Sequence, residues 1–440
     1  MRAALLAIGA LLIAVSILIS GNSLQTSAIA IRADLEGFPL FLIGLLHSGY
    51  FVGYIVGCRV TPHLVQRVGH IRTFTALASI ASASALAHIL IVEPVPWLVL
   101  RAVSGLCLAG LQMVLESWIN ERATNENRGR LLSLYRIVDL SAATLGNMLL
   151  ATANPAGFAL LALTSILISL SLVPVALTTS TAPQPVRSAK LDVGRLWRVS
   201  PLSAAGALAI GAANGSFWSM GPVFVQRLGY DAGTVATFMS AVIVGGGIAQ
   251  WPLGLLSDKI DRRRVILIVS ACCAVAGAAL AASAGGGRAA LIAIAPAFGF
   301  FAMPLFGLCM AHGIDHAEHD DYVTVTAGLL LLYGIGSIVG PPIAPLLMQA
   351  SGPATLFAFT SAIHVAFVLF GLYRLTRRAP VPLDEQAAYV PVPRTSPAVF
   401  ELDPRKDQKA AEEDGASEQA TGASGAADDE PDNRPSPQAE

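Results

Sequence analysis

The chain has 440 residues, of which 54% are hydrophobic and 13% are charged. A soluble protein carries about 25% charged residues, so this composition excludes an ordinary soluble domain and indicates a chain surrounded mainly by lipid. The net charge is −1, but residues 401–440 hold 12 acidic and 4 basic residues, a net of −8, which leaves +7 for residues 1–400. The basic residues lie in short loops between apolar segments, a pattern that excludes a nucleic-acid surface.

Twelve apolar segments are long enough to cross a membrane, because a hydrocarbon core of ~30 Å needs roughly 20 apolar residues per helix. We therefore expect an all-α membrane protein with twelve transmembrane helices that lie in a lipid bilayer. In chain order, the expected helices are 4–30, 41–61, 73–92, 97–119, 131–153, 156–178, 202–226, 232–257, 265–284, 288–312, 322–348 and 354–375.

Two polar stretches divide the chain. Residues 179–201 contain three prolines and four basic residues, so we predict a six-helix bundle at 1–178, a cytoplasmic linker at 179–201 and a second six-helix bundle at 202–378. From residue 379 the chain is rich in Pro, Ala, Gly, Ser and acidic residues. Such a segment buries too little apolar surface to offset its loss of conformational entropy, which predicts a disordered cytoplasmic tail at 379–440.

The distribution of Lys and Arg predicts the orientation in the membrane, since these residues concentrate on the cytoplasmic side. If the N-terminus is cytoplasmic, seventeen basic residues between Arg2 and Arg378 lie on the inner side, and only Arg32, Arg227 and Arg288 lie on the outer side. We therefore expect a multi-pass protein of a bacterial inner membrane with both termini in the cytoplasm.

The two halves of the chain resemble each other. Asn22 precedes Asn214 by 192 residues, and 62–72 precedes 254–264 by the same offset. Leu131–Ile137 matches Leu329–Ile335 at five of seven positions, 198 residues apart. With six helices in each half, these matches predict two pseudo-symmetric six-helix bundles, an architecture that lets a transporter rock around a central site.

A short charged segment begins in the last turn of the eighth expected helix and reads Gly254-Leu-Leu-Ser-Asp258-Lys259-Ile-Asp261-Arg262-Arg263. The equivalent turn of the first half keeps Arg67, Gly69 and Arg72 but has Pro62 and Gln66 in place of a glycine and an acid. Both turns resemble the Gly-x-x-x-Asp-Arg-x-Gly-Arg-Arg signature of the major facilitator superfamily of secondary transporters. The resemblance covers about residues 1–378. It implies a cytoplasmic gate motif formed by Arg67, Gly69, Arg72, Gly254, Asp258, Lys259, Asp261, Arg262 and Arg263.

Two other segments add to this resemblance. Arg101-Ala-Val-Ser-Gly105 is similar to the Arg-x-x-Gln-Gly pattern of proton-coupled members, with Ser104 in place of Gln. The segment around Glu116–Gly129, together with Ala311–Asp315, resembles a branch of bacterial facilitators whose substrates are mostly unassigned. The Gly-Pro pattern that ends helix 5 in antiporters is absent.

Charged residues inside the expected helices are the candidates for proton coupling, because a charge at the membrane centre costs about 2.5–3.5 kcal/mol on insertion scales. Arg101, Gln112 and Glu116 share one face of helix 97–119, and Arg136, Asp139 and Asn147 share one face of helix 131–153. The facing pairs are Glu116–Arg136 or Arg101–Asp139, and depth favours the first. The alternative is a permanent ion pair that joins the helices or, for Arg101, a side chain that snorkels to the outer interface.

Five polar or aromatic residues are the candidates for substrate contact: Asn22, Gln25, Gln112, Asn214 and Trp218. All but Gln112 lie on the first and seventh expected helices, which line the cavity in the resembled family. The alternative role is hydrogen bonding between helices.

The histidines indicate no metal site. His312, His316 and His319 share a helix face as metal ligands do, but they fall in an expected loop at the inner gate. His47 is expected in the apolar core, and Tyr50 and Tyr54 are expected to pack between helices or at the interface. We predict no metal and no cofactor.

These observations favour a monomeric secondary transporter that moves a small neutral, zwitterionic or amphiphilic solute by alternating access, with protons as the coupling ion. The chain has no phosphate-binding Gly-Lys-Ser/Thr loop, which disfavours an ATP-driven pump. It also shows no catalytic constellation, so we expect no enzyme. The alternatives are a sensor or scaffold that acts through its tail and, less favoured, a membrane-embedded enzyme.

Overall fold

The computed structural model describes residues 2–124, 127–177, 193–317, 322–383, 385–391, 396 and 398–399. All regular secondary structure in this part of the chain is helical. Most of the linker expected at 179–201, and all of 401–440 in the expected tail, lie outside the described residues. Within the linker range, Val193–Val199 forms the short helix α7.

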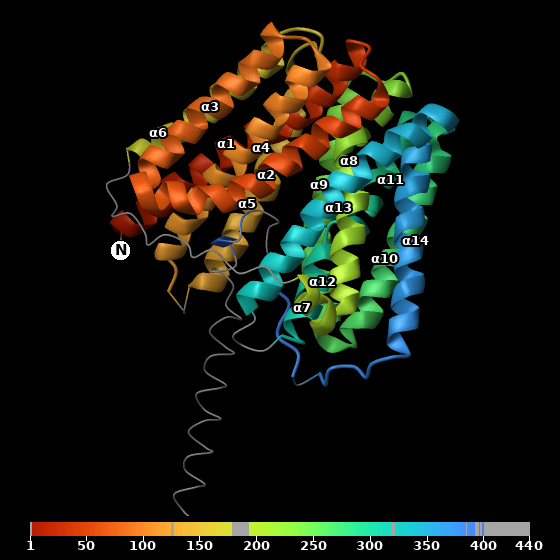
Figure 1. Ribbon diagram of the computed structural model, residues 1–440. Coiled ribbons are helices and arrows are strands. Elements are labelled where there is room, and N and C mark those ends of the chain that lie inside the picture. The colour runs from red at the N-terminus through yellow and green to blue at the C-terminus, as the bar shows by residue number, and fades with distance from the viewer. Residues whose placement is uncertain are drawn as a thin grey trace, which may run out of the picture.

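The first bundle contains six long helices (Figure 1). They are α1 (Arg2–Leu35), α2 (Leu40–Val68), α3 (His70–Leu90), α4 (Pro94–Glu121), α5 (Arg128–Met148) and α6 (Ala159–Ala176). Helix α2 continues about two turns beyond the expected end at residue 61, because the polar segment before Gly69 is still helical. The fifth helix changes at Leu149–Thr152 to the 3-10 helix η1, close to Pro155.

The second bundle contains six more spans, one of which is broken. The spans are α8 (Pro201–Arg227), α9 (Ala232–Lys259), α10 (Arg262–Ala282) with the 3-10 helix η2 (Ser283–Gly285), α11 (Gly287–Ala302) with α12 (Leu305–Ile314), α13 (Tyr322–Ser351) and α14 (Thr355–Leu375). The expected single helix 288–312 is thus two helices that meet at Met303 and Pro304. Pro304 has no N–H to donate to the preceding turn, so the backbone hydrogen-bond ladder is interrupted at this residue.

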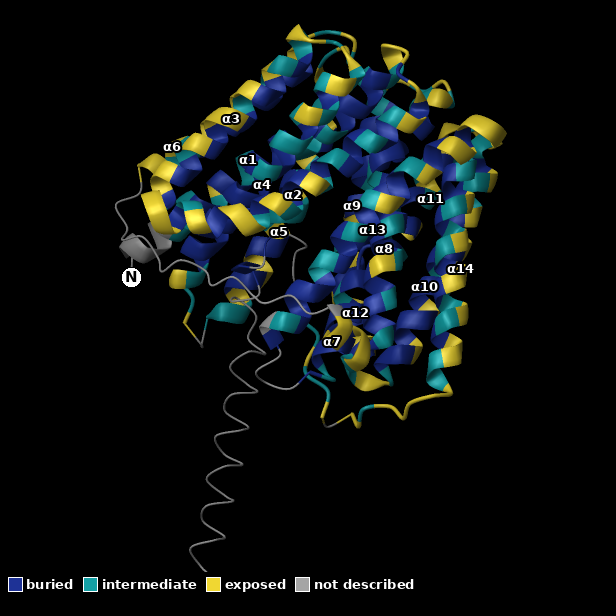
Figure 2. Ribbon diagram, viewed as in Figure 1, coloured by how far each residue is buried: buried dark blue, intermediate teal, exposed yellow. Residues whose placement is uncertain are grey.

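Ten spans of the described chain are long and apolar enough to cross a membrane, with α11 and α12 counted together. The other two long helices, α5 and α8, are not among the ten. They are the more polar helices: α5 carries Arg136, Asp139 and Asn147, and α8 carries Asn214. Buried residues lie on the helix faces that point inward and exposed residues on the faces that point outward (Figure 2).

Pairs of glycines allow helix backbones to touch, and the same pairs recur in both halves. A Cβ at Gly53 of α2 would overlap the carbonyl oxygen of Ala102 in α4, and one at Gly105 would overlap that of Tyr50. In the second half, a Cβ at Gly245 of α9 would overlap the carbonyl oxygen of Pro296 in α11, and one at Gly299 would overlap that of Val242. Gly53 and Gly245 are 192 residues apart, and Gly105 and Gly299 are 194 apart. The internal repeat therefore holds at the level of backbone contacts.

The two bundles contact each other at the ends of α1 and α8. Asp34 and Arg227 form an ion pair there, with 2.7 Å between Oδ1 and Nη2. Nearby, Ser48 Oγ of α2 donates a hydrogen bond to the carbonyl oxygen of Ile338 in α13 at 2.7 Å. We call this end of the molecule the Asp34 end, and the opposite end, where α9 meets α10, the Arg262 end. In Figure 1 the bundles converge at the Asp34 end and diverge towards the Arg262 end.

The residues after α14 differ from the expected free tail. Ala387 and Tyr389 make backbone hydrogen bonds to charged residues of the second bundle, and Ser396 makes one through its side chain to Glu116 of the first bundle. Ser396, Ala398 and Val399 are buried. At these described residues the chain is therefore in contact with the bundles.

We expect Gly53→Ala and Gly299→Ala each to lower the free energy of unfolding by about 1–3 kcal/mol, the usual cost of an overpacked core. The physical reason is that a methyl group at either position must push two helix backbones apart. Thermal unfolding of the purified protein in detergent measures the effect. Gly9→Ala is the matched control, since a Cβ there meets nothing within 4 Å. An equal melting temperature for all three variants would contradict the packing described above.

Candidate functional site: a polar cavity between the bundles

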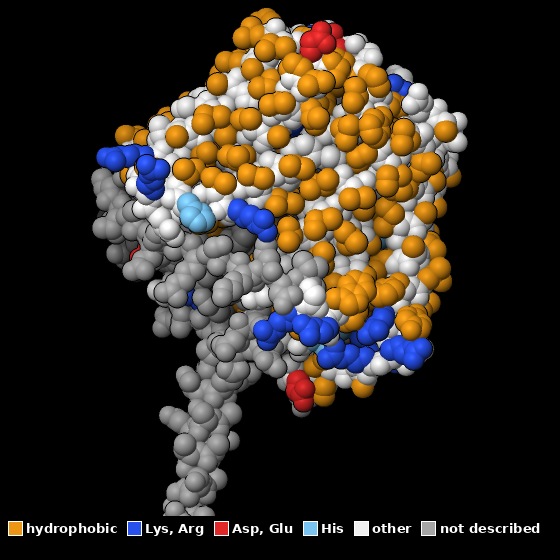
Figure 3. All heavy atoms as spheres, in the orientation of Figure 1, with side chains coloured by type: hydrophobic (Ala, Val, Ile, Leu, Met, Phe, Trp, Pro, Cys, Tyr) orange, Lys and Arg blue, Asp and Glu red, His pale blue; other side chains and the backbone are white. Residues whose placement is uncertain are grey.

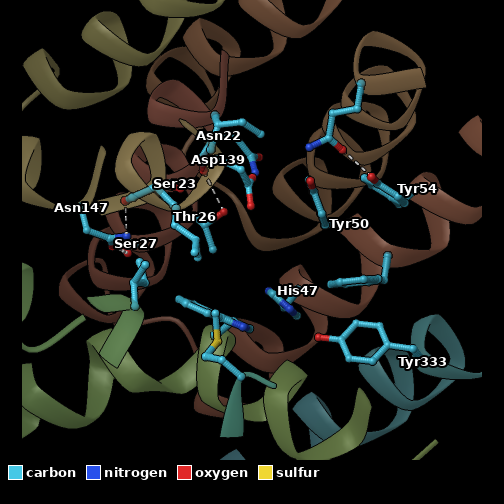
Figure 4. Close-up of a pocket in the computed structure, with 18 of the residues that line it drawn as sticks. Asn22, Ser23, Thr26, Ser27, His47, Tyr50, Tyr54, Asp139, Asn147 and Tyr333 are labelled. Carbon is cyan, nitrogen blue, oxygen red and sulfur yellow. Dashed lines mark hydrogen bonds between the residues drawn. The ribbon is translucent and has the colours of Figure 1, made fainter. Parts of the chain in front are cut away.

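A cavity of about 210 Å³ lies between the two bundles (Figure 4). Helices α1, α2, α4 and α5 of the first bundle contribute most of its wall, and α8, α9 and α13 of the second bundle, with Met303, complete it. The lining residues are Ile19, Asn22, Ser23, Thr26, Ser27, His47, Tyr50, Phe51, Tyr54, Gln112, Arg136, Asp139, Leu140, Ala143, Asn147, Trp218, Ile243, Met303 and Tyr333.

One wall of the cavity consists of hydroxyl and amide groups. Asn22 and Thr26 are four residues apart and therefore share a face of α1, with Ser23 and Ser27 beside them. Ser27 Oγ donates a hydrogen bond of 2.7 Å to Oδ1 of Asn147 on α5. Oδ1 of Asn22 is buried and has no hydrogen-bond partner among the described residues. This wall can therefore accept a hydrogen bond from a bound molecule.

The opposite wall is aromatic. His47, Tyr50, Phe51 and Tyr54 lie on successive turns of α2, with 5.8 Å between the ring centroids of Tyr50 and Tyr54. Phe51 contacts Tyr333 of the second bundle edge to face at 6.4 Å. The hydroxyl of Tyr54 donates a hydrogen bond to Oε1 of Gln112. Rings of this kind provide flat apolar contact together with polar edges.

A charged pair lies in the cavity wall. Nη1 of Arg136 and Oδ2 of Asp139 are 2.6 Å apart on one face of α5, and the two side chains are only 10% and 14% exposed. Nε of Arg136 also donates a hydrogen bond of 3.1 Å to Oε1 of Gln250 on α9. Because α9 belongs to the second bundle, Arg136 links the charged pair directly to the contact between the bundles.

Arg101 occupies a different place. Its side chain is buried and lies over the ring of Tyr50, with 4.6 Å from Cζ to the ring centroid. Nη1 has no hydrogen-bond partner among the described residues. A second, much smaller cavity lies beside the first and is lined by Arg101 together with His47, Trp218 and Ser219. Arg101 is therefore placed in the interior and held by the π face of Tyr50, without snorkelling to the outer interface.

Glu116 is fully buried at the other end of α4. Its Oε1 accepts a hydrogen bond of 2.7 Å from the hydroxyl of Tyr135, and its Oε2 accepts one from Ser396. Glu116 does not line the cavity. Of the four expected proton-coupling residues, only Arg136 and Asp139 thus lie in the main cavity wall, and they pair with each other along α5.

The expected substrate-contact residues separate into two groups. Asn22, Gln112 and Trp218 line the cavity. Gln25 and Asn214 are buried but do not belong to the lining. Both amide atoms of Gln25, and Nδ2 of Asn214, have no hydrogen-bond partner among the described residues. They lie behind the wall, between helices.

Several residues that line the cavity are not among those expected there from the sequence. His47 is expected in the apolar core and Tyr50 and Tyr54 in packing positions, and the sequence predicts no role for Thr26, Ser27 and Tyr333. A signal is present in the spacing, since His47, Tyr50 and Tyr54 recur at three and four residues and so share one face of α2. Which side of a membrane helix faces a cavity is not visible from the helix alone.

The gate motif of the second half forms a buried charge network at the Arg262 end. Arg262 donates to both carboxylate oxygens of Asp315 at 2.8 and 2.6 Å, and each side chain of this pair is 1% exposed. Its Nη2 also lies 2.9 Å from Asp258. Asp315, at the end of α12, therefore completes the network, although it is not one of the residues expected in the gate.

Asp261 is the N-cap residue of α10, and its carboxylate forms an ion pair with Arg263 in the first turn of that helix. Partial burial acts to raise its pKa, but the side-chain and backbone hydrogen bonds from Arg263, with the charges of Arg263 and Arg264, outweigh it and hold the pKa of Asp261 below its usual value. Lys259 is exposed. In the first half, Arg67 and Arg72 are exposed as well. Gly69 lies between α2 and α3 and has φ +86°, a left-handed conformation that lets the chain change direction between the two helices.

Within the described part of the chain, no three His, Cys, Asp or Glu residues are grouped as metal ligands. His312 and His316 contact each other edge to face, whereas His319 lies outside the described residues.

Comparisons with known proteins agree on one family. The Major Facilitator Superfamily profile matches residues 8–330. A protein of Escherichia fergusonii described as an uncharacterized MFS-type transporter, YcaD, is 27% identical over 378 residues, which cover 84% of this chain and 97% of the relative.

Solved structures show the same fold. The nucleoside transporter NupG superposes with a TM-score of 0.72 at 12% identity, over 85% of this chain and 99% of NupG. A bacterial homologue of the human lysosomal transporter Spinster, in an inward-facing and occupied conformation, superposes with a TM-score of 0.67 at 14% identity, over 86% of this chain and 97% of its own. Because the family profile covers more than half of the residues, this chain belongs to the major facilitator superfamily of membrane transporters.

Proposed function

We propose that this protein moves a small solute across the bacterial inner membrane by alternating access, coupled to protons, as a monomer with both termini in the cytoplasm. The observation that carries the proposal is the polar cavity, whose wall comes from both bundles, with the bundles joined at the Asp34 end. A site between two pseudo-symmetric bundles can be exposed to either side when one bundle rocks against the other.

The contacts at the Asp34 end are of a kind that can open. Arg227 is 40% exposed in its pair with Asp34, and an exposed ion pair contributes only about 0–1 kcal/mol. The remaining polar contacts are single hydrogen bonds, such as that from Ser240 Oγ to the carbonyl oxygen of Thr144. Rocking has to separate these weak polar contacts together with the close backbone contact between α2 and α13, where a Cβ at Gly44 would overlap the carbonyl oxygen of Pro341.

The surface supports the proposed orientation. On the face shown in Figure 3, basic residues gather along the lower edge, at the Arg262 end. Apolar side chains cover most of the surface between this edge and the opposite end. Lys and Arg concentrate on the cytoplasmic side of membrane proteins. We therefore assign the Arg262 end to the cytoplasm and the Asp34 end to the outer side.

The lining supports a neutral, zwitterionic or amphiphilic substrate. Its two charges, Arg136 and Asp139, already pair with each other, and the rest of the wall offers hydroxyl, amide and aromatic groups. We assign substrate contact to Asn22 and Trp218, on helices of the two bundles, and to Gln112. Gln25 and Asn214 support the wall from behind.

Proton coupling is assigned to Asp139. When Asp139 takes up a proton, it loses the charge that pairs with Arg136, and Arg136 also bonds to Gln250 across the bundle interface. Proton binding and the contact between bundles are thus linked through one guanidinium group. Glu116 and Arg101 act in support, since neither lines the main cavity.

Trp218→Ala and Asn22→Ala should each weaken substrate binding about tenfold, equivalent to about 1.4 kcal/mol, because each removes a side chain that lines the cavity. The measurement is thermal shift of the purified protein against a metabolite and drug library, followed by titration of any compound that stabilises the wild type. Trp197→Ala is the matched control, because Trp197 is exposed on α7. Unchanged affinity in both cavity variants would place the substrate elsewhere.

Asp139→Asn should abolish substrate-driven proton flux, because an amide cannot release a proton. The protein is reconstituted in liposomes, and internal pH is followed under a gradient of the compound identified by thermal shift. Asp231→Asn makes the same chemical change at the exposed N-cap of α9 and should leave the flux intact. If Asp139→Asn and Glu116→Gln both retain wild-type flux, the buried acids are structural.

Joining the bundles at the Asp34 end should stop transport. In a background without the five native cysteines, Asp34→Cys and Arg227→Cys are cross-linked with a short thiol-reactive reagent, and uptake into liposomes is measured before and after. We expect uptake to fall to the level of protein-free vesicles only in the cross-linked double variant, because the Asp34 end can then no longer open. Full activity after complete cross-linking would exclude alternating access through this end.

A further inference from the structure

The chain after α14 returns along the Arg262 end. Figure 1 shows it leaving α14 and crossing below the second bundle towards α7 and α12. We call five of its described residues the docked tail residues: Ala387, Tyr389, Ser396, Ala398 and Val399. Residues 392–395 and 397 lie outside the described part of the chain.

The backbone of the docked tail completes the charge network of the second bundle. The N–H of Tyr389 donates to both carboxylate oxygens of Asp258 at 2.9 and 3.1 Å. The N–H of Ala387 donates to Oδ1 of Asp315 at 3.2 Å, and its carbonyl oxygen accepts from Nη2 of Arg262 at 2.8 Å. Both carboxylates and the guanidinium of the network therefore each bind the tail directly. Hydrogen bonds with a charged partner are stronger than neutral ones.

Two glycines form a socket for the Tyr389 ring. A Cβ at Gly254 would overlap the ring, and one at Gly307 would lie 2.8 Å from the Tyr389 hydroxyl oxygen. Gly254 belongs to the gate motif on α9, and Gly307 lies on α12. Any larger residue at Gly254 would push the ring out, so the socket fits this side chain closely.

The same tail also reaches the first bundle. The hydroxyl of Ser396 donates a hydrogen bond to Oε2 of Glu116 on α4, and Glu116 has no solvent-exposed surface. The backbone N–H of Ala398 in turn donates to Ser396 Oγ at 3.1 Å, and Ala398 and Val399 are fully buried. One segment thus binds acidic residues of both bundles at one end of the molecule.

We infer that the Arg262 end carries a peptide-binding site whose occupant is the protein's own tail, and that this binding holds the two bundles apart at that end. The inference rests on the proposed alternating access. In the opposite conformation, the α4 end of the first bundle and the α9–α10 turn of the second must approach each other. Ser396, Ala398 and Val399 then have to leave the buried positions that they occupy in this structure. Tail binding and closure of the Arg262 end therefore exclude each other, and a ligand that binds only one of two conformations shifts the population towards it.

The test measures the separation of the bundles directly. Arg67→Cys and Arg264→Cys place spin labels on exposed residues of the two bundles in a full-length background without native cysteines, and pulsed electron paramagnetic resonance gives the distance distribution. Tyr389→Ala and Ser396→Ala together should raise the ratio of short to long distances about threefold or more, because the long-distance state loses its ligand.

Three controls isolate the docking site. Tyr389→Phe keeps the ring and the backbone N–H and should preserve the wild-type distribution. Tyr373→Ala removes an exposed tyrosine of α14 and should do the same. Gly254→Val fills the socket without changing the tail and should reproduce the effect of the tail variants.

An unchanged distance ratio in both the tail double variant and Gly254→Val would overturn the inference. Uptake into liposomes is measured with the same spin-labelled protein that carries the native tail. This measurement separates the outcome above from failure of the proposed function. Active uptake with unchanged distances refutes only the role of the tail. Absent uptake, with a single fixed distance in every variant, refutes alternating access and the inference together.

Discussion

Contact between helix backbones at glycine residues is the constraint on which the rest of the structure depends. Helices in lipid gain little from burying apolar side chains against one another, so close packing holds them together. Gly53 and Gly105 bring α2 against α4, and Gly245 and Gly299 bring α9 against α11. A second repeated contact has the same form: a Cβ at Gly146 would overlap the carbonyl oxygen of Ser20, and one at Gly340 would overlap that of Ala212. These contacts hold the helices of each bundle together.

Polar residues gather at the surface where the two bundles meet. Helices α5 and α8 are the two long helices of the described chain that are not apolar enough to count as simple spans, and each contacts the other bundle, α5 through α9 and α8 through α1. The polar residues of α5 are tolerated because they face the cavity and one another: Arg136 pairs with Asp139 and bonds to Gln250. A lipid-facing position would leave such charges unsatisfied. The site therefore combines the charged face of α5 with the polar and aromatic faces of the apolar helices α1 and α2.

The charge network at the Arg262 end joins helices within the second bundle and also binds the tail. The pair of Arg262 with Asp315 is almost fully buried, and such a pair is stable only when its remaining hydrogen-bonding capacity is also satisfied. The tail backbone supplies part of that capacity at Ala387 and Tyr389. The network thus joins α9, α10 and α12 inside the second bundle and, through the proposed tail site, couples this bundle to Glu116 of the first. In the degenerate motif of the first half, by contrast, Arg67 and Arg72 are exposed.

The sequence alone determined the helical membrane fold and the six-plus-six repeat, because these depend on local composition, on the length of apolar segments and on spacing along the chain. The gate motif stays a prediction that rests on the resemblance of the charged turns. It also proposed Asn22, Gln112, Trp218, Arg136 and Asp139 as candidates, from the charges inside the expected helices and from the resemblance, and all five line the cavity. Only the tertiary structure decided that Arg136 pairs along α5, that Arg101 lies over Tyr50, that His47, Tyr50 and Tyr54 face the cavity, and that Asp315 and the tail complete the network. Most of these are contacts between segments far apart in the chain, and the rotation of each helix about its axis, which sets them, is fixed by packing against its neighbours.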